Sequence, residues 1–248
     1  MNITLDINTG DCIRCGHCVR VCPSRIFSQE EKNGPVAVQN VQTCIGCGHC
    51  VAACPKNAVR HSLFPPEKTH PYSVKDYPTP EQMTLLCKGR RSNRAFTTAP
   101  VPVEALRQIV EAAHRAPTAS NLQQVAFTVI TDPARLRQIT EFTLDVYRSA
   151  LKKLRNPLLK PIIRLSMPDA AHYVPTFERL IREYKAGNDL ILRGATAVIL
   201  IHTPRQCRFG TEDANLAYQN GSLMAECLGV DHSTVIRKLK KYGINATK

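Results

Sequence analysis

The N-terminal part of the chain contains two copies of one cysteine pattern. CIRCGHCVRVCP runs from Cys12 to Pro23, and CIGCGHCVAACP runs from Cys44 to Pro55. The copies are offset by 32 residues, which is typical of one supersecondary unit used twice. Together they hold eight of the eleven cysteines of this 248-residue chain. The first residues lack the basic and apolar segments of a secretory signal. We therefore expect a cytoplasmic protein, in which metal ligation is favoured over disulfide pairing.

The spacing C-x2-C-x2-C-x3-C-P resembles that of bacterial ferredoxins with two [4Fe–4S] clusters. In that family three thiolates of each copy surround one cluster and the fourth reaches the other cluster. The resemblance implies one cluster on Cys12, Cys15, Cys18 and Cys54, and a second on Cys44, Cys47, Cys50 and Cys22. Glycines 16, 46 and 48 permit close approach of the backbone to the clusters.

Two other interpretations of the repeat are a zinc site and a disulfide framework. Zinc sites take four ligands, commonly from two CxxC pairs, and do not need this longer pattern twice. His17 and His49 lie inside complete ligand sets, so we expect them to be exposed or to neighbour the ligands. Cys87, Cys207 and Cys227 lack matching partners and are predicted to be ordinary buried cysteines.

The rest of the chain predicts an α+β fold, with a Pro-rich segment separating it from the cysteine repeat. The expected domains are a ferredoxin-like domain at 1–62, an extended linker at 63–80, a second domain at 81–229, and a basic helical tail at 230–248. Strands are expected at 3–7, 35–43 and 125–131, with a buried strand at 195–203. Helices are expected from 79–81 onward, over 133–154, 176–187 and 210–229, and over 103–116. In the last of these, Val103, Leu106, Ile109, Val110 and Ala113 share one face. The proline-rich block at 156–175 is predicted to be a lid or a dimer arm.

Three segments of the second domain resemble the nitroreductase family of FMN flavoproteins. These are GRRSNRAF (89–96), APTASNLQQVAF (116–127) and GTEDANLAYQNGSLMAECLGV (210–230). The resemblance implies that Arg90, Arg91, Ser92 and Arg94 bind the FMN phosphate, for which guanidinium groups are suited. It also implies that Thr118, Asn121 and Gln123 contact the flavin, and that the protein is a homodimer. The whole arrangement is a ferredoxin-like domain followed by a nitroreductase-like α+β sandwich that lacks its usual C-terminal part.

The last segment resembles a bacterial helix-turn-helix in place of that C-terminal part. Ala225 precedes the predicted turn, Gly229 forms it, and Val235 and Leu239 pack the second helix. Ser233, Thr234, Arg237 and Lys238 would face DNA. From Asp231 onward the tail has five Lys or Arg residues against one Asp, and the whole chain has a net charge of +13. Residues 225–241 are therefore a candidate DNA-binding segment.

These features predict an iron–sulfur flavoprotein oxidoreductase. Electrons from a redox protein or a reduced nicotinamide would pass through two [4Fe–4S] clusters to FMN, and then to a small nitro- or quinone-like acceptor. No protein nucleophile or acid–base pair stands out, which suits electron transfer by cofactors. One alternative is a redox-sensing DNA-binding regulator, and another is a ferredoxin-type carrier with a non-functional flavin domain. No apolar run approaches the roughly 18–20 residues of a membrane span, so no membrane partner is expected.

Overall fold

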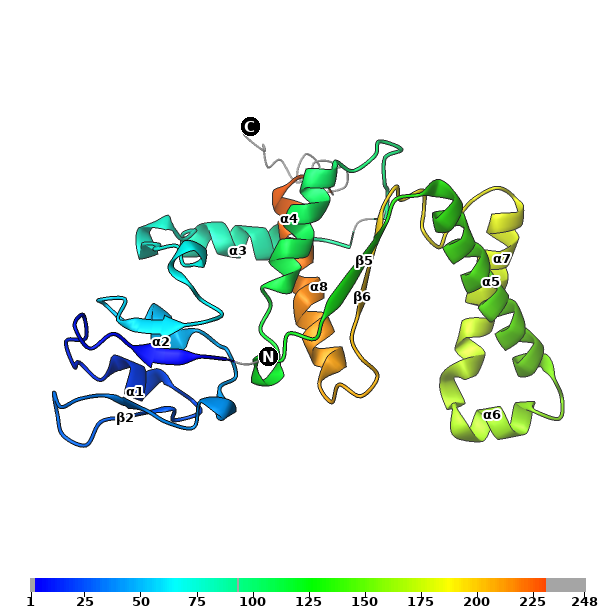
Figure 1. The fold of residues 1–248 in the computed structure, drawn as a ribbon. Helices are drawn as coiled ribbons and strands as arrows, with labels where there is room; N and C mark the ends of the chain where they lie inside the picture. The colour runs from blue at the N-terminus through cyan, green and yellow to red at the C-terminus, as the bar shows by residue number, and fades with distance from the viewer. Residues whose placement is uncertain (1–2, 93, 231–248) are drawn as a thin grey trace. The chain divides into compact units, whose positions relative to one another are not determined.

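The computed structural model describes residues 3–92 and 94–230 (Figure 1). The chain forms two compact units that are not continuous in sequence. Unit 1 comprises Met1–Thr79 together with Pro117–Gln123, and unit 2 comprises Pro80–Ala116 and Gln124–Lys248. Helices and small sheets occur in both, which confirms the α+β class. No helix among the described residues is both long enough and apolar enough to cross a membrane.

Unit 1 is built from two small antiparallel sheets and two short helices. Strand β1 (Leu5–Ile7) pairs with β4 (Val59–His61), and β2 (Phe27–Ser28) pairs with β3 (Ala37–Val38). Helices α1 (His17–Val21) and α2 (His49–Ala52) each begin directly after a glycine of the cysteine repeat, and these glycines have positive φ angles. Apolar side chains and thiols form one core, whose buried members are Ile7, Cys18, Ile26, Phe27, Cys50 and Val59.

The strand predicted at 35–43 is shorter than expected, and the linker is less extended. Asn40 adopts a φ of 53°, which turns the chain out of β3 into the 3-10 turn Val41–Thr43. The linker contains two further 3-10 turns, Pro66–Lys68 and Val74–Asp76, so its prolines do not exclude local structure. The second turn is closed by Ser73 and Asp76, whose side chains each accept a backbone N–H of the other.

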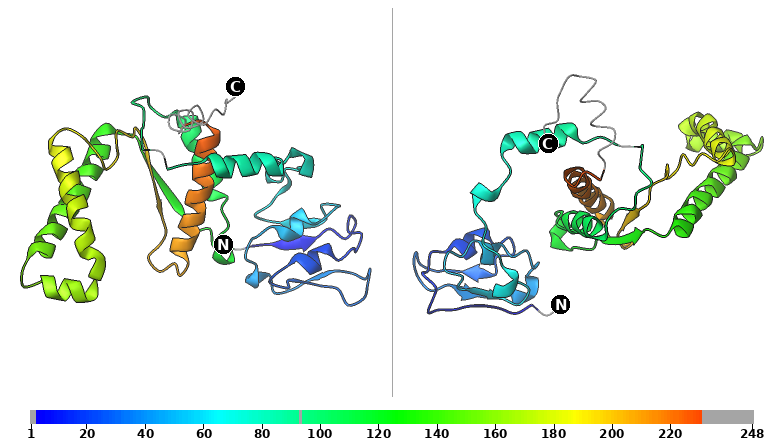
Figure 2. Two further views of the ribbon diagram at one scale, coloured as in Figure 1. Left: turned by 180° about the vertical axis from the view of Figure 1, so that it is seen from behind. Right: turned by 90° about the horizontal axis from the view of Figure 1, so that it is seen from above.

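Unit 2 contains the remaining helices and one pair of strands (Figures 1 and 2). These are α3 (Pro80–Gly89), α4 (Val103–His114), β5 (Ala126–Ile130), α5 (Pro133–Arg155), α6 (Lys160–Ser166), α7 (Val174–Lys185), β6 (Val198–His202) and α8 (Gly210–Cys227), with a 3-10 segment at Pro168–Tyr173. β5 and β6 pair antiparallel, with Ala126 opposite His202 and Ile130 opposite Val198. The proline-rich block at 156–175, predicted to be a lid or a dimer arm, contains α6 and the 3-10 segment after it.

Helices α4 and α8 lie side by side against the strand pair (Figures 1 and 2). Gly221 of α8 makes the close approach possible, since a Cβ there would lie 3.3 Å from the Cβ of Ala113. Asn220 also donates to the carbonyl of Ala112 at 3.3 Å. Leu106, Ile109 and Ala113 are buried as predicted, but Val103 is 67% exposed, because it lies in the first turn of the helix.

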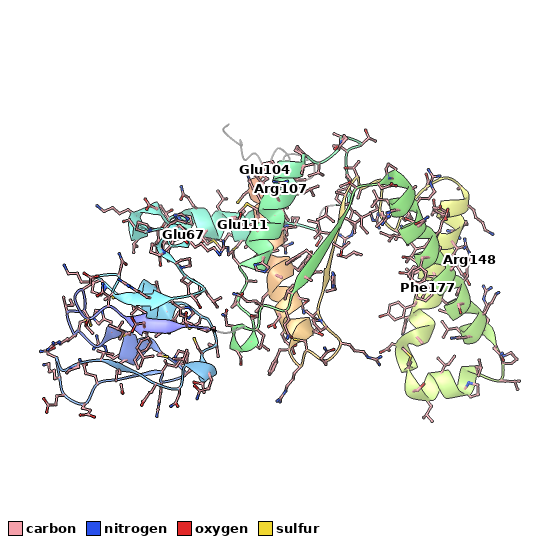
Figure 3. The ribbon with its side chains drawn as sticks, in the orientation of Figure 1. Glu67, Glu104, Arg107, Glu111, Arg148 and Phe177 are labelled. Atoms are coloured by element: carbon pink, nitrogen blue, oxygen red, sulfur yellow. The ribbon has the colours of Figure 1, made fainter. Side chains whose placement is uncertain are left out.

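Helices α5 and α7 pack through aromatic and polar contacts. The rings of Tyr147 and Phe177 stack with their centroids 4.4 Å apart, and Arg155 is paired with Glu178. Figure 3 shows Phe177 on this pair of helices. Asp132 caps the start of α5, and its carboxylate accepts the N–H groups of Ala134 and Arg135 at 2.7 and 3.1 Å.

The predicted buried strand at 195–203 was wrong in its burial. β6 has only β5 as a partner in the described part of the chain, and Leu200 is 43% exposed. The sheet has only two strands here, and the helices packed against it do not cover both of its faces. Side chains on the uncovered face therefore stay open to solvent.

Candidate iron–sulfur and flavin site

The eight cysteines of the repeat line two separate cavities in unit 1. One cavity is lined by Cys12, Cys15, Cys18 and Cys54, which we call the first set. The other is lined by Cys22, Cys44, Cys47 and Cys50, which we call the second set. Each set combines three thiols of one copy with the fourth thiol of the other copy. This is the grouping that the ferredoxin resemblance implies, and it fits a cluster held between the two copies.

The electrostatics of the buried thiols follow the same grouping. Burial raises the pKa of Cys50 to about 11, and the N–H of Val51 partly opposes that shift. Charge on the other members of the second set raises the pKa of Cys50 further. Burial likewise raises the pKa of Cys18, and charge on Cys12 and Cys54 adds to it. Four thiolates gathered in one cavity repel each other, and iron ions would relieve this repulsion.

The eleven cysteines all lie in the described part of the chain, and none of them is joined in a disulfide there. Over residues 3–92 and 94–230, no three His, Cys, Asp or Glu side chains converge closely enough to hold one metal ion. The thiols of each set surround a cavity instead.

A backbone N–H group donates to the fourth cysteine of each copy, which belongs to the set formed by the other copy. Ile26 N–H donates to Cys22 Sγ at 3.4 Å, and its equivalent Ala58 N–H donates to Cys54 Sγ at 3.2 Å. The glycines keep the loops close. A Cβ on Gly48, where φ is 72°, would lie 3.0 Å from the Phe64 ring. Hydrogen bonds to sulfur of this kind tune the potential of an iron–sulfur cluster.

His61, which the sequence did not single out, lies beside the second set. It is only 4% exposed, and burial lowers its pKa, so the neutral ring is favoured. Leu63 N–H donates to Nδ1 at 3.1 Å, which assigns the ring proton to Nε2, 3.5 Å from Cys44 Sγ. The side chain therefore donates to a thiol. Extending the repeat past Pro55 would have drawn attention to it, since His61 aligns with Gln29.

The arginine segment predicted to bind FMN phosphate belongs to unit 2. Arg91 and Arg94 are exposed, and Arg90 is half-buried just after α3. Arg91 Nη1 donates to the carbonyls of Lys88 and Arg90 at 2.6 and 2.8 Å, and Arg94 Nη1 donates to that of Ser92 at 3.2 Å. Three guanidinium groups within five positions present enough N–H donors for a phosphate as well.

The second predicted flavin segment, Pro117–Gln123, groups with unit 1. Thr118, Asn121 and Gln123 are joined to one another. Gln123 N–H donates to Thr118 Oγ1 at 3.0 Å, and Gln123 Nε2 donates to Asn121 Oδ1 at 3.4 Å. Asn121 Nδ2 donates to the carbonyls of Ile45 and Gly46, both at 3.0 Å. The segment thus contacts the loop that carries Cys44 and Cys47, and its contact with a flavin stays a prediction.

The remaining cysteines and histidines behave partly as expected. Cys207 is half-buried, but Cys87 and Cys227 are exposed, so their predicted burial was wrong. They lie near the C-terminal ends of α3 and α8, where little of the described chain covers them. His17 and His49 are both exposed, and both flank the ligand sets as expected.

The helix-turn-helix prediction falls mostly outside the described residues. Gly229 has a φ of 68°, and Val230 N–H bonds the carbonyl of Ala225 at 3.2 Å, so α8 does end in the expected glycine turn. The predicted packing and DNA-facing positions at 233–239 lie beyond residue 230, outside the part that the structure describes.

Comparison with known families bears on both units. The model of the nitroreductase family matches residues 87–235, which is more than half of the chain. The chain belongs to the nitroreductase family. A 4Fe–4S dicluster domain precedes the nitroreductase domain and matches residues 4–55.

Individual relatives match parts of the chain. A Thermus thermophilus NADH dehydrogenase is 50% identical over 52 residues, which are 21% of this chain and 25% of that protein. Nitrobenzene nitroreductase of Ectopseudomonas oleovorans is 40% identical over 73 residues, which are 29% and 32% of the two chains. The chain thus spans about a quarter to a third of the length of these curated relatives.

A solved nitroreductase is also similar to part of the chain. The nitroreductase of Bacteroides fragilis, solved with bound FMN, has 18% sequence identity and a TM-score of 0.43. The similarity covers 66% of this chain and 81% of that chain.

Proposed function

We propose that the protein is an iron–sulfur flavoprotein oxidoreductase that passes single electrons through two [4Fe–4S] clusters to FMN and on to a small organic acceptor. The observation that carries this proposal is the division of eight thiols into two cavities within a chain whose larger domain belongs to the nitroreductase family. Bound FMN would supply the exchange between one-electron and two-electron chemistry. The chain itself supplies the cluster ligands, the phosphate-binding arginines and the polar side chains around the flavin.

The proposal assigns a role to each group of residues. The first set and the second set each hold one cluster. Arg90, Arg91 and Arg94 bind the phosphate together with Ser92, because the three arginines lie within five positions and Arg91 and Arg94 are exposed. Thr118 and Gln123 contact the flavin from the segment that also contacts the second set. The electron donor is a redox protein or a reduced nicotinamide, and the acceptor is nitro- or quinone-like.

A homodimer belongs to the same proposal. An open, mostly apolar cavity lies where α4 meets β5, lined by Val103, Leu106, Val110 and Val129 among others, with Arg107 and Glu111 beside them (Figure 3). Exposed apolar surface of this kind marks a protein interface. A second copy of the chain is the proposed partner there.

Anaerobic purification with quantification of iron, sulfide and flavin tests the proposal. We expect about eight iron ions and eight sulfides per chain, as two cubane clusters require, and one FMN. Eight iron ions without FMN would refute the flavoenzyme and leave an electron carrier. Stoichiometric zinc in place of iron would refute the clusters as well.

A DNA-binding regulator is the second candidate, favoured by the glycine turn at the end of α8. The test is retention of the intact chain on DNA at increasing salt, compared with a chain lacking residues 231–248. Loss of a steeply salt-dependent retention in the shortened chain would support this role. Equal retention of both chains would rule out the tail as the contact.

A further inference from the structure

We propose that electrons leave unit 1 from the second cysteine set, and that Asn121 is the positioning residue that holds segment Pro117–Gln123 against the loop of that set. The inference rests on the proposed function, because it names the cluster from which FMN is reduced. In each transfer the reduced cluster of the second set loses one electron, and FMN gains that electron. The donor of the proposed function then replaces it.

The contact itself is specific. Asn121 uses both N–H groups of its amide, one toward Ile45 O and one toward Gly46 O. These two carbonyls belong to the residues between Cys44 and Cys47. Asn121 is half-buried and has a φ of 55°, an orientation that Asn tolerates better than most residues. Ser120 and Gln123 also have positive φ angles, both 51°, so the segment holds a conformation that other contacts must maintain.

The internal repeat shows that this contact breaks a symmetry. Gly46 in the second copy is equivalent to Arg14 in the first copy. The carbonyl of Arg14 accepts a hydrogen bond from Gln29 Nε2 at 3.0 Å, and the same amide donates to Gly34 O at 2.7 Å. In the first copy, the carbonyl in the cluster loop is thus bonded by a side chain of the ferredoxin-like region itself. In the second copy, the equivalent carbonyl is bonded by Asn121, which lies in the region that matches the nitroreductase family.

The position that supplies Gln29 in the first copy holds His61 in the second copy. Its imidazole donates to Cys44 Sγ at 3.5 Å, whereas Gln29 donates to backbone carbonyls. Cys44 Sγ also accepts the N–H of Gly46 at 3.4 Å. Donors to ligand sulfur stabilise the added negative charge of a reduced cluster, which raises its potential. Within unit 1 an electron is therefore expected to move to the cluster of the second set, which has the higher potential.

The two observations lead to the same set. His61 stands in the second copy where the first has Gln29. This difference gives the second set an extra donor to sulfur and leaves the carbonyl of Gly46 without the bond that Gln29 makes to Arg14. Asn121 then occupies that carbonyl and brings Thr118 and Gln123 to the loop. A flavin contacted by this segment would be reached from the second set through Asn121 or the backbone of Ile45 and Gly46.

The test compares matched amide-to-acid changes in the two copies. Asn121→Asp keeps the shape and the tolerated φ but replaces both donors by acceptors that are repelled by the carbonyls. Asn121→Gly removes the side chain and relieves the positive φ. Gln29→Glu makes the corresponding change at the first set. Each chain is purified anaerobically and checked for iron and FMN content. It is then mixed with substoichiometric dithionite while cluster and flavin signals are followed by stopped-flow absorbance and rapid-freeze EPR.

Both Asn121 variants are expected to slow flavin reduction about 10-fold or more, with reduced-cluster EPR signals persisting. They should also increase amide hydrogen exchange at residues 45–48 and shift the potential of one cluster. Gln29→Glu should increase exchange at residues 13–16 and shift the other potential while flavin reduction keeps its wild-type rate. A wild-type rate in both Asn121 variants, or equal slowing in Gln29→Glu, would overturn the inference. Absence of FMN from the wild-type chain would instead overturn the proposed function, and the exit route with it.

Discussion

His61 donates to a ligand sulfur of the second set, whereas its counterpart Gln29 in the first copy donates to backbone carbonyls. Replacing His61 with Phe keeps a ring in the buried space and removes the donor to Cys44 Sγ. We expect the potential of one cluster to fall by roughly 40 mV, which is a hydrogen bond of about 1 kcal/mol in a one-electron couple. EPR-monitored redox titration measures the change. His49→Phe, in the same copy but without a bond to a ligand sulfur in the described structure, should leave both potentials in place. An unchanged potential in H61F would contradict the assigned role of the imidazole.

Gly48 is one of the glycines at which the cluster loops oppose a side chain. Its φ of 72° opposes substitution, and so does the Phe64 ring, which would lie 3.0 Å from an added Cβ. Gly48→Ala should destabilise unit 1 by about 1–2 kcal/mol and lower the iron content of the purified chain. Gly89→Ala is the control, because a Cβ there meets nothing within 4 Å. Equal iron content in both variants would show that the loop yields more easily than its geometry indicates.

Among the elements, the contact between α4 and α8 is set by one small residue. Gly221→Val would place branched methyl groups against Ala113 and Ile109, so the helices would have to separate. We expect unit 2 to lose about 1–3 kcal/mol of stability, measured by calorimetric unfolding. Gln219→Val introduces the same β-branched residue at an exposed position of α8 and serves to subtract the helix-propensity cost. If both variants lost the same stability, close packing at Gly221 would not be the cause.

The elements also show which parts of the structure the sequence could predict. Helix α4 and helix α5 follow from apolar spacing and from start signals, which are local. The grouping of the thiols is implied by the resemblance to two-cluster ferredoxins. The exposure of Leu200 depends instead on how many strands join the sheet, and the positions of Cys87 and Cys227 depend on what covers two helix ends. The bonds from Asn121 to Ile45 and Gly46 join segments about 75 positions apart, which no local pattern encodes.

For the whole molecule, the small core of unit 1 implies that its stability depends on metal. Its buried side chains are few, and each of its two cavities is lined by four thiols that repel one another once ionised. Domains of this size commonly need a metal or another covalent constraint. Removing iron with a chelator under reducing conditions should abolish the protection of residues 4–62 from hydrogen exchange, while α4 and α8 stay protected. Persistent protection of unit 1 without iron would contradict this dependence.

The exposed apolar surface of unit 2 leads to a prediction about assembly. Sedimentation of the anaerobic holoprotein should give the mass of two chains. Val129→Lys, at a strand position that is 41% exposed, should shift the equilibrium toward one chain by placing a charge in the α4–β5 cavity. Phe142→Lys, at an exposed position of α5, is the matched control. A single-chain mass for the unaltered protein would contradict the proposed homodimer.

The discontinuity of unit 1 has a consequence for how the protein is made and how it could have evolved. A ribosome releases Met1–Thr79 well before it releases Pro117–Gln123. The carbonyls of Ile45 and Gly46 can therefore bond to Asn121 only after part of unit 2 has been synthesised. Cutting the gene at the proline-rich linker would separate Ile45 and Gly46 from Asn121, which bonds to their carbonyls. The two domains, which are adjacent in sequence, are thus expected to be inherited and to mature together rather than as exchangeable modules.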